Sequence, residues 1–302
     1  MKRVQFILVV DILTALLLLL PGKSHADSVQ FNSGKTVKCR ILSASQTTLF
    51  IELQTSQEPR TVERELAIAD LHKIMFSEGY FDSNGKLDPA LSFETVAEIW
   101  KGLHPVITRP GNTVALVGVN LCGMMLESKD ASLADDALKI LAFIKSNACD
   151  PAYQVAAADS EIHALERLRR YAQAKSAAIR FEGVGNPLPL QLRANLTIGI
   201  CGHEEMRLFL EDNPRWAQDP RVHKERQSIY EHTLDSYVFT NLFGGENEQL
   251  SGRALYQEAL FHLLCGERSE ADRIYKELST RFQTSTYTKQ LKDELNIVIQ
   301  AH

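Results

Sequence analysis

The chain has 302 residues, of which 44% are hydrophobic and 24% are charged, and its formal net charge at pH 7 is −5. This length suits one hydrophobic core with a smaller second domain. The acidic balance excludes nucleic acid from the expected partners, because affinity for nucleic acid depends on clustered Lys and Arg.

Residues 1–26 have the pattern of a secretory signal peptide. A basic start at Lys2 and Arg3 precedes a long apolar run rich in leucine, and small residues stand at the end of the segment. We predict cleavage after Ala26, which places the mature protein in the periplasm or outside the cell. Asp11 within the apolar run opposes insertion, and an uncleaved membrane anchor is the alternative.

Residues 27–77 alternate apolar and polar side chains with the period of a β-strand. Asn32 to Lys35 is typical of a turn between the first two strands, and three further strands are predicted up to Phe76. Five short strands in so short a segment cannot hide their edges in a flat sheet. We therefore predict a small closed five-stranded β-barrel.

Residues 78–91 are rich in Gly, Asp, Asn and Pro and are predicted to be a linker. Residues 92–302 show helical periodicity throughout, and Ser92 is the expected cap of the first helix. Further helices are predicted at about 112–127, 132–147, 151–182 with a break near Ala172, 188–201, 203–212, 221–242, 252–265, 269–282 and 285–299. The fold class is α+β and mostly α, with a helical array or α-solenoid after the barrel.

Gly252 to Phe282 is predicted to form two amphipathic helices joined by a short turn. The segment resembles a tetratricopeptide repeat (TPR) unit. Ala259 and Ala271 stand at the small positions of the two helices, Gly266 at the turn, and Tyr275 at the aromatic position of the second helix. The resemblance implies a TPR-like α-solenoid, and the alternative is a helical hairpin in another kind of bundle.

This unit departs from the family's pattern at two positions. Gln283 stands where TPR units usually have Pro, and His262 where they usually have Tyr. The resemblance implies that Arg253, Tyr256 and Leu260 lie on the inner face of the first helix, where they would contact a protein or peptide partner. The alternative is that the three side chains pack against the preceding hairpin.

The segments Val29–Ile41 and Ile68–Phe76 resemble the small SH3-like or Sm-like barrels. Cys39 stands where Sm-like chains commonly have Gly, and the Asp/Asn loop with which Sm proteins hold RNA is missing. The resemblance therefore implies the barrel fold without RNA binding.

Candidate chemistry is confined to one acidic cluster, His203, Glu204 and Glu205. A zinc site of the HExxH kind needs a second His four residues after the first, and that position holds Arg207. We expect these three residues to begin a helix, where carboxylates interact favourably with the helix dipole. The alternative is a hydrolase or carbohydrate-active enzyme that uses them.

Two other groups of residues are expected to be structural. Arg167, Arg169 and Arg170 are predicted to form a solvated helix face. The five cysteines lack a CxxC pair, which disfavours a metal knuckle. Three of them, Cys122, Cys201 and Cys265, are each followed by Gly and are predicted to be small apolar residues where helices approach closely. A single disulfide, for example from Cys122 to Cys149, is left open.

The sequence thus predicts an exported, non-enzymatic, TPR-like scaffold or adaptor that binds a protein or peptide in the cell envelope, with no catalytic residue, metal or cofactor. Association with the membrane is expected only if the signal segment is retained. Beside the enzymatic alternative, the third possibility is a structural envelope protein that associates with itself through the edge strands of the barrel.

Overall fold

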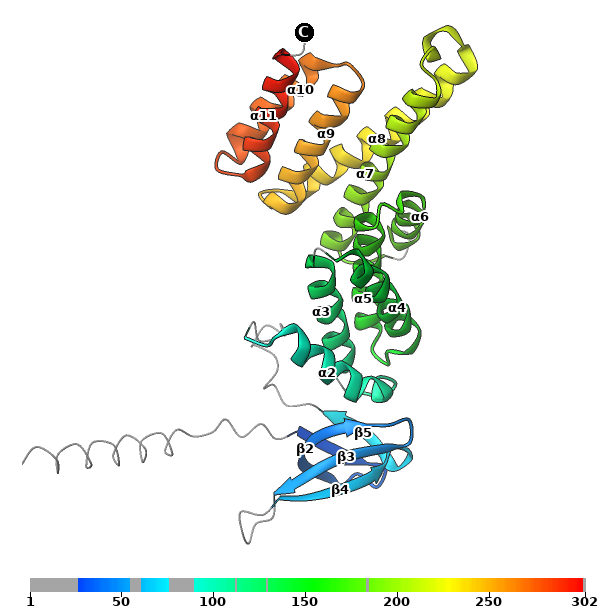
Figure 1. The fold of residues 1–302 in the computed structure, drawn as a ribbon, viewed down its shortest axis with the longest axis vertical. Coiled ribbons are helices and arrows are strands. Elements are labelled where there is room, and N and C mark those ends of the chain that lie inside the picture. Colours follow the sequence, from blue (N-terminus) through cyan, green and yellow to red (C-terminus); the bar gives the residue numbers. More distant parts are fainter. Residues whose placement is uncertain are drawn as a thin grey trace, which may run out of the picture. The chain divides into compact units, whose positions relative to one another are not determined.

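The computed structural model describes residues 27–54, 61–75, 90–111, 113–128, 130–182 and 185–300. The predicted signal segment and the predicted linker up to residue 89 lie outside these ranges. Within them, five β-strands precede ten α-helices (Figure 1). The prediction of a β segment followed by a helical array is therefore confirmed.

The five strands form one antiparallel sheet. They are β1 (Asp27–Phe31), β2 (Thr36–Ala44), β3 (Thr48–Gln54), β4 (Thr61–Ala67) and β5 (Leu71–Met75), in the order β4-β3-β2-β1-β5. Val29 pairs with Val37 of β2 on one side and with Ile74 of β5 on the other. Apolar side chains on one face are buried, among them Val29, Leu49, Ile51, Leu71 and Ile74.

The closed barrel predicted for this segment is not formed. β4 and β5 are joined by the short 3-10 turn Ile68–Asp70, yet they lie at opposite ends of the strand order, and β5 pairs with β1. The sheet is therefore open in this part of the chain. Most side chains of the edge strand β4 are exposed, including Glu63, Arg64 and Glu65, and charged side chains on an edge strand disfavour pairing with other chains.

The first helix packs on this sheet. Ser92 caps α2 (Phe93–Leu103) by accepting a hydrogen bond from the Thr95 backbone N–H at 3.3 Å, as predicted. Val96, Trp100 and Leu103 are buried, and the Cβ position of Gly102 lies 3.9 Å from Ser43 of β2. The sheet therefore buries part of its surface against helical residues.

The chain forms two compact units, and their boundary lies inside a helix. The first extends to Leu121 and also contains Asn147–Asp150; the second contains Cys122–Ser146 and the chain from Pro151 onward. This boundary divides α3 (Val114–Glu127). The separation of domains at the linker remains a prediction.

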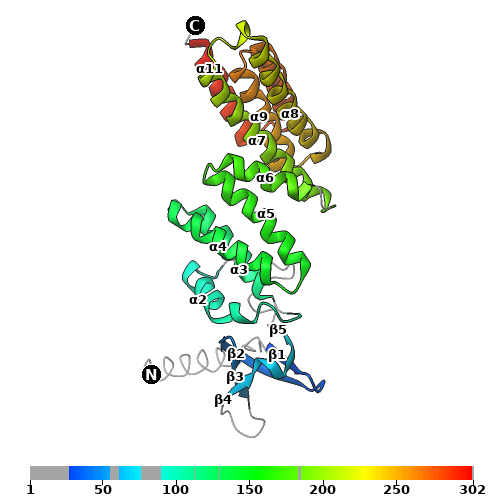
Figure 2. The same cartoon turned by 90° about the vertical axis from the view of Figure 1, so that its right-hand side faces the viewer.

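The second unit is a succession of helices joined by short turns (Figure 2). After α4 (Ala131–Asn147) these are α5 (Pro151–Arg167), α6 (Tyr171–Glu182), α7 (Leu188–Asp212), α8 (Pro220–Gly244), α9 (Arg253–Leu264), α10 (Arg268–Arg281) and α11 (Thr286–Gln300), with a π-helix, η5 (Glu248–Gly252), before α9. Among the described residues, no helix combines the length and the apolar composition that a membrane span requires.

One helix corrects the sequence prediction. The predicted break between helices at 201 and 203 does not exist, because α7 continues through Cys201, Gly202 and His203 for 25 residues. The glycines in this helix face α8. A Cβ at Gly199 would lie 2.6 Å from the Tyr237 ring, and one at Gly202 would lie 2.2 Å from the Thr233 hydroxyl. Glycine is therefore required here for close helix packing and does not end the helix.

The α9–α10 hairpin has the predicted turn. Gly266 has a φ of 80°, and the backbone N–H of Glu267 donates to the His262 carbonyl at 2.8 Å, which ends α9 in the manner of a Schellman motif. Ala259 and Ala271 are both fully buried where the two helices meet. α11 covers the remaining apolar surface of the hairpin with Leu291 and Leu295.

Candidate functional site

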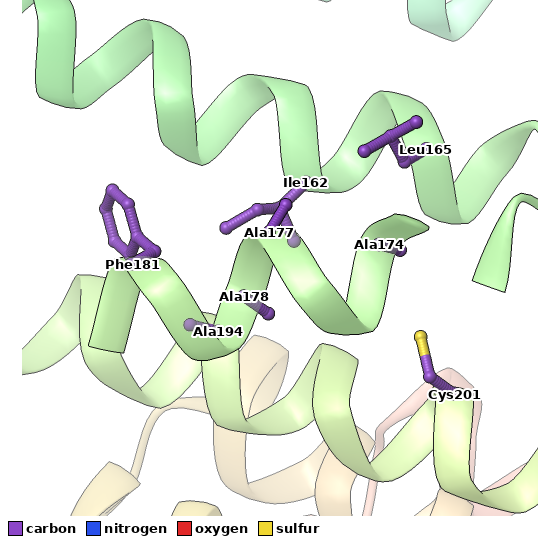
Figure 3. Close-up of a cluster of buried hydrophobic side chains, with 8 residues drawn as sticks. All are labelled: Ile162, Leu165, Ala174, Ala177, Ala178, Phe181, Ala194 and Cys201. Carbon is purple, nitrogen blue, oxygen red and sulfur yellow. The ribbon is translucent and has the colours of Figure 1, made fainter. Parts of the chain in front are cut away.

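Helix α6 is the centre of the candidate site because its two sides carry different residues. Ala174, Ala177, Ala178 and Phe181 recur at helical spacing and are buried. Figure 3 shows them pointing into a core shared with Ile162 and Leu165 of α5 and Ala194 and Cys201 of α7. Alanine side chains allow α6 to lie close to both neighbours. The other face of α6, which includes Gln173 and Arg180, is exposed.

The turn from α5 into α6 holds Arg169 in an unusual backbone conformation. Its φ is 55°, the only positive φ of a non-glycine residue in the described part of the chain. The N–H of Arg169 donates to the Glu166 carbonyl and that of Arg170 to the Leu165 carbonyl, both at 2.9 Å, so the turn is a Schellman motif. Glycine is the usual residue here. An L-residue in this conformation costs roughly 1 kcal/mol.

A groove extends along both sides of α6, and we call it the α6 groove. The part between α6 and α7 has a volume of about 610 Å³ and includes Tyr171 and Leu208 among its apolar residues. The part between α6 and the α4–α5 pair has a volume of about 790 Å³ and includes Leu138 and Leu165. Both parts share Arg170, Ala172 and Gln173, so they adjoin across α6.

Every carboxylate that lines the α6 groove is already paired within the chain. The pairs are Asp135 with Arg170 at 2.6 Å, Glu205 with Lys175 at 2.5 Å, Glu204 with Arg207 at 2.6 Å, and Glu161 with Lys145. Lys139, which also lines the groove, pairs with Asp136. These pairs leave no negative charge in the groove without an opposite charge beside it.

Two cations of the α6 groove have no such partner. In the part of the chain that the structure describes, the guanidinium groups of Arg169 and Arg180 make neither an ion pair nor a side-chain hydrogen bond, although both line the groove. They lie at opposite ends of α6, roughly 15 Å apart at the rise of an α-helix. The residual charge of the groove is therefore positive and is located at its two ends.

The acidic cluster that the sequence singled out is divided between two environments. The expectation that His203, Glu204 and Glu205 begin a helix is wrong, because they lie in the middle of α7. Glu204 and Glu205 line the groove. His203 instead packs in an edge-to-face contact with Phe261 of α9, with 5.5 Å between the ring centroids. The three side chains therefore do not converge on one point.

Two of these groups have perturbed pKa values with a clear cause. Hydrogen bonds from Arg207 lower the pKa of the Glu204 carboxyl, and burial lowers the pKa of the His203 imidazole. Glu204 is therefore held as a carboxylate by Arg207 and His203 as a neutral imidazole. A general acid would need the opposite shift for the carboxyl group.

The three residues of the TPR-like unit predicted to bind a partner lie on α9. Arg253 donates to Glu166 of α5 at 2.5 Å and is partly buried. Tyr256 contacts Tyr287 of α11, with 5.7 Å between ring centroids. Leu260 packs against the hydrophobic cluster formed by α9, α10 and α11. The structure thus gives each residue an internal contact and brings none of them to the α6 groove. Their role in binding a partner remains a prediction.

The described part of the chain contains no metal-binding cluster, and its buried thiols are poorly suited to act as nucleophiles. No three His, Cys, Asp or Glu side chains there gather in a metal-binding arrangement. The cysteines are free thiols. Cys122 and Cys201 are buried, as predicted for small apolar positions, and burial raises the pKa of each thiol to about 12. Cys265 is only partly buried, and burial raises the pKa of its thiol to about 11. Thiols with so high a pKa are poor nucleophiles.

Sequence reasoning missed Arg169 and Arg180 as site residues. The run Arg167 to Arg170 gave a signal, but we interpreted it as a solvated helix face. Arg167 donates to the Ser128 carbonyl and Arg170 pairs with Asp135, which leaves Arg169 alone in this run without a side-chain partner among the described residues. This distinction depends on tertiary contacts that local sequence does not contain.

Comparison of the chain with protein-family models, with curated proteins and with solved structures found no match.

Proposed function

We propose that this protein is a non-enzymatic helical scaffold whose α6 groove binds an acidic segment of a partner protein. The observation that carries the proposal is the charge pattern of the groove. All four of its carboxylates are paired internally, while Arg169 and Arg180, at its two ends, make no ion pair with any described residue. Such a surface attracts acidic partners and repels basic ones.

The dimensions of the groove favour an extended peptide over a small molecule. Each part of the groove is as large as a typical small-molecule pocket, and the two parts adjoin. An extended chain rises about 3.3 Å per residue, so two of its side chains roughly 15 Å apart are separated by about five residues. The expected ligand is a segment with two acidic residues at about this spacing.

Apolar contacts between the charged ends would supply part of the affinity. Leu208 is 47% exposed on the α7 side of the groove, and Tyr171 lies at the start of α6. Tyrosine and leucine side chains of this kind bury apolar area against a ligand, and tyrosine is common among residues that dominate binding energy. We expect at least one apolar side chain of the bound segment to lie between its two acidic residues.

The proposal also includes that the helical unit is TPR-like and that the protein is exported. The buried Ala259 and Ala271, together with the turn at Gly266, support a repeat-like hairpin. The signal-like pattern of residues 1–26 supports export to the cell envelope. The open five-stranded sheet would act as a docking module of the SH3-like or Sm-like kind.

The enzymatic alternative is less favoured by the geometry. Glu204 and Glu205 each hold an ion pair, and His203 faces α9 away from both. The self-association alternative is less favoured because the edge strand β4 carries exposed charged residues.

Selection from a random peptide display library against the purified protein tests the proposal. We expect the selected peptides to be enriched in Asp and Glu pairs about five residues apart. The variant Arg169→Gly/Arg180→Ala should lose these binders. The control variant Arg215→Ala/Lys224→Ala removes the same charge from exposed positions outside the groove and should retain them.

Two results would contradict the proposal. The first is a selection without any acidic consensus. The second is equal loss of binding in both variants, which would mean that the overall charge of the protein, and not the α6 groove, attracts the peptides.

A further inference from the structure

A second pocket in the helical unit contains two arginines and lies apart from the α6 groove. It has a volume of about 370 Å³ and lies between α5, the start of α7, η5 and α9. His163, Arg193 and Arg253 line it together with Gln249 and Leu250 of η5. None of its lining residues lines the α6 groove. This volume is within the range typical of sites for small ligands.

Each arginine of this pocket is oriented by a carboxylate, of which Asp159 is buried and Glu166 is partly buried. Arg193 donates through Nη2 to Asp159 at 2.6 Å, and Arg253 donates through Nη2 to Glu166 at 2.5 Å. The hydroxyl of Thr197 donates to the other oxygen of Glu166 at 3.1 Å. The carboxylates therefore hold both guanidinium groups in place while using only part of their donor capacity, because a guanidinium group has five N–H donors.

One of the remaining donors is buried without a partner. Nε of Arg193 is shielded from solvent and has no hydrogen-bond acceptor among the described residues. An unsatisfied buried donor destabilises the folded protein, because it has lost its hydrogen bonds to water. A ligand that supplies an acceptor at this point would relieve this destabilisation.

The wall of the pocket includes a rare secondary structure. η5 is a π-helix, and the side chain of Asn247 caps its start by accepting hydrogen bonds from the backbone N–H of Gln249 at 3.0 Å and of Leu250 at 3.2 Å. Its end leads directly into Arg253, the first residue of α9. π-Helical turns are uncommon and are frequent at functional sites. This observation is independent of the charges.

We propose that this pocket binds the carboxylate or phosphate group of a small molecule, which is held between the guanidinium groups of Arg193 and Arg253. The planar fork of N–H donors in arginine matches the oxygens of both groups. His163 lies beside the two arginines and two carboxylates; burial lowers its pKa, so it would face the ligand as a neutral imidazole able to donate one hydrogen bond.

Isothermal titration of the purified protein at low ionic strength tests this site, with inorganic phosphate and malonate as the probes. We expect at least one probe to bind. Binding of phosphate alone would identify a phosphate-bearing ligand, and binding of malonate alone would identify a carboxylate. Binding of neither probe would overturn the proposal.

Variants separate a binding role from a structural one. Asp159→Asn/Arg193→Gln removes both charges of one ion pair, so neither is left without its partner, and it should weaken binding by at least about tenfold. Glu166→Gln keeps the hydrogen bond from Thr197 but frees the charge of Arg253, so it should strengthen binding severalfold. If the ion pair between Arg253 and Glu166 had only a structural role, this variant would not increase the affinity for the probes.

The control is Arg268→Gln on α10, which loses an ion pair with Asp272 outside the pocket; the Arg268 side chain is about as exposed as that of Arg253. It should bind the probes as the unmodified protein does. Unchanged affinity in both pocket variants would overturn the proposal. If Asp159→Asn/Arg193→Gln fails to fold, the increase expected for Glu166→Gln still decides the question.

Discussion

Opposite faces of α7 show two different uses of the same helix. On one face, Gly199 and Gly202 allow α8 to approach so closely that a methyl group would overlap Tyr237 or Thr233. On the other face, Glu204, Glu205 and Leu208 line an open groove in which both carboxylates are paired with cations and the Leu208 side chain remains partly exposed. Close packing against α8 therefore fixes the position of α7, while its opposite face lines the groove that we propose binds a partner.

The largest expected effect comes from filling the tight face. Gly199→Val places carbon atoms within the volume of the Tyr237 ring, whose nearest atom lies 2.6 Å from the Cβ position. We expect a loss of about 3 kcal/mol in the free energy of unfolding, measured by denaturant titration. Gly123→Ala in α3 is the control, because nothing lies within 4 Å of its Cβ position.

The control substitution should not lower the free energy of unfolding. Alanine is favoured over glycine within a helix by roughly 1 kcal/mol, so Gly123→Ala should be neutral or stabilising. Equal destabilisation by both substitutions would mean that the α7–α8 contact is not the tightly packed region that the comparison describes.

A second prediction concerns a carboxyl group that is buried on a packed helix face, in contrast to the ion-paired carboxylates that line the groove. Glu258 of α9 is 6% exposed, and burial raises the pKa of its carboxyl from 4.5 to about 7. The folded state therefore holds this proton more tightly than the unfolded state does. Stability from this group is fully present below about pH 4.5 and is lost as the pH rises to about 7.

Glu258→Gln tests this effect without changing the size of the side chain. Above pH 7 we expect the variant to be more stable than the unmodified protein by on the order of 2 kcal/mol. Near pH 4 the difference should be small, because the carboxyl is then protonated in both states. Unfolding curves at the two pH values measure this, and a difference independent of pH would contradict the assignment.

The smallest effect on stability is expected at the groove itself. Arg169→Gly relieves the left-handed backbone conformation of Arg169 and should stabilise the protein by about 1 kcal/mol. The control Arg167→Gly, at the helical last position of α5, should destabilise it by about the same amount. Thermal unfolding of the two variants gives the comparison.

These two neighbouring substitutions also separate stability from binding. We expect Arg169→Gly to weaken the binding of acidic peptides although it stabilises the fold. A variant that gains stability and keeps full affinity would remove Arg169 from the binding site.

Much of the local structure could be predicted from the sequence. The strands follow from alternation in residues such as Val37, Cys39 and Ile41, and the break between α5 and α6 fell within a few residues of the position predicted near Ala172. Local periodicity is sufficient for such elements because each buries one face.

The two main errors have a tertiary cause. Gly202 looked like the end of a helix, yet it lies inside α7 because Thr233 of α8 occupies the space beside it. The sheet is open because its two edge strands, β4 and β5, do not pair with each other among the described residues. The local pattern of apolar residues predicts neither the packing of α7 against α8 nor the pairing of the edge strands.

The candidate site was less predictable than the fold. Three arginines close together in sequence, Arg167, Arg169 and Arg170, differ only in what they meet after folding. The left-handed conformation of Arg169 was also hidden, because glycine is the residue that usually signals it.

The measurement that tests the central claim most directly is a double-mutant cycle between the groove and a selected acidic peptide. Arg169→Gly and Arg180→Ala are each combined with a neutral substitution of either acidic residue of the peptide, and the affinities are measured by titration. The account predicts a coupling energy of about 1 kcal/mol for each arginine with one acidic residue and almost none with the other. Coupling energies near zero for all four combinations would contradict binding of the peptide along the α6 groove.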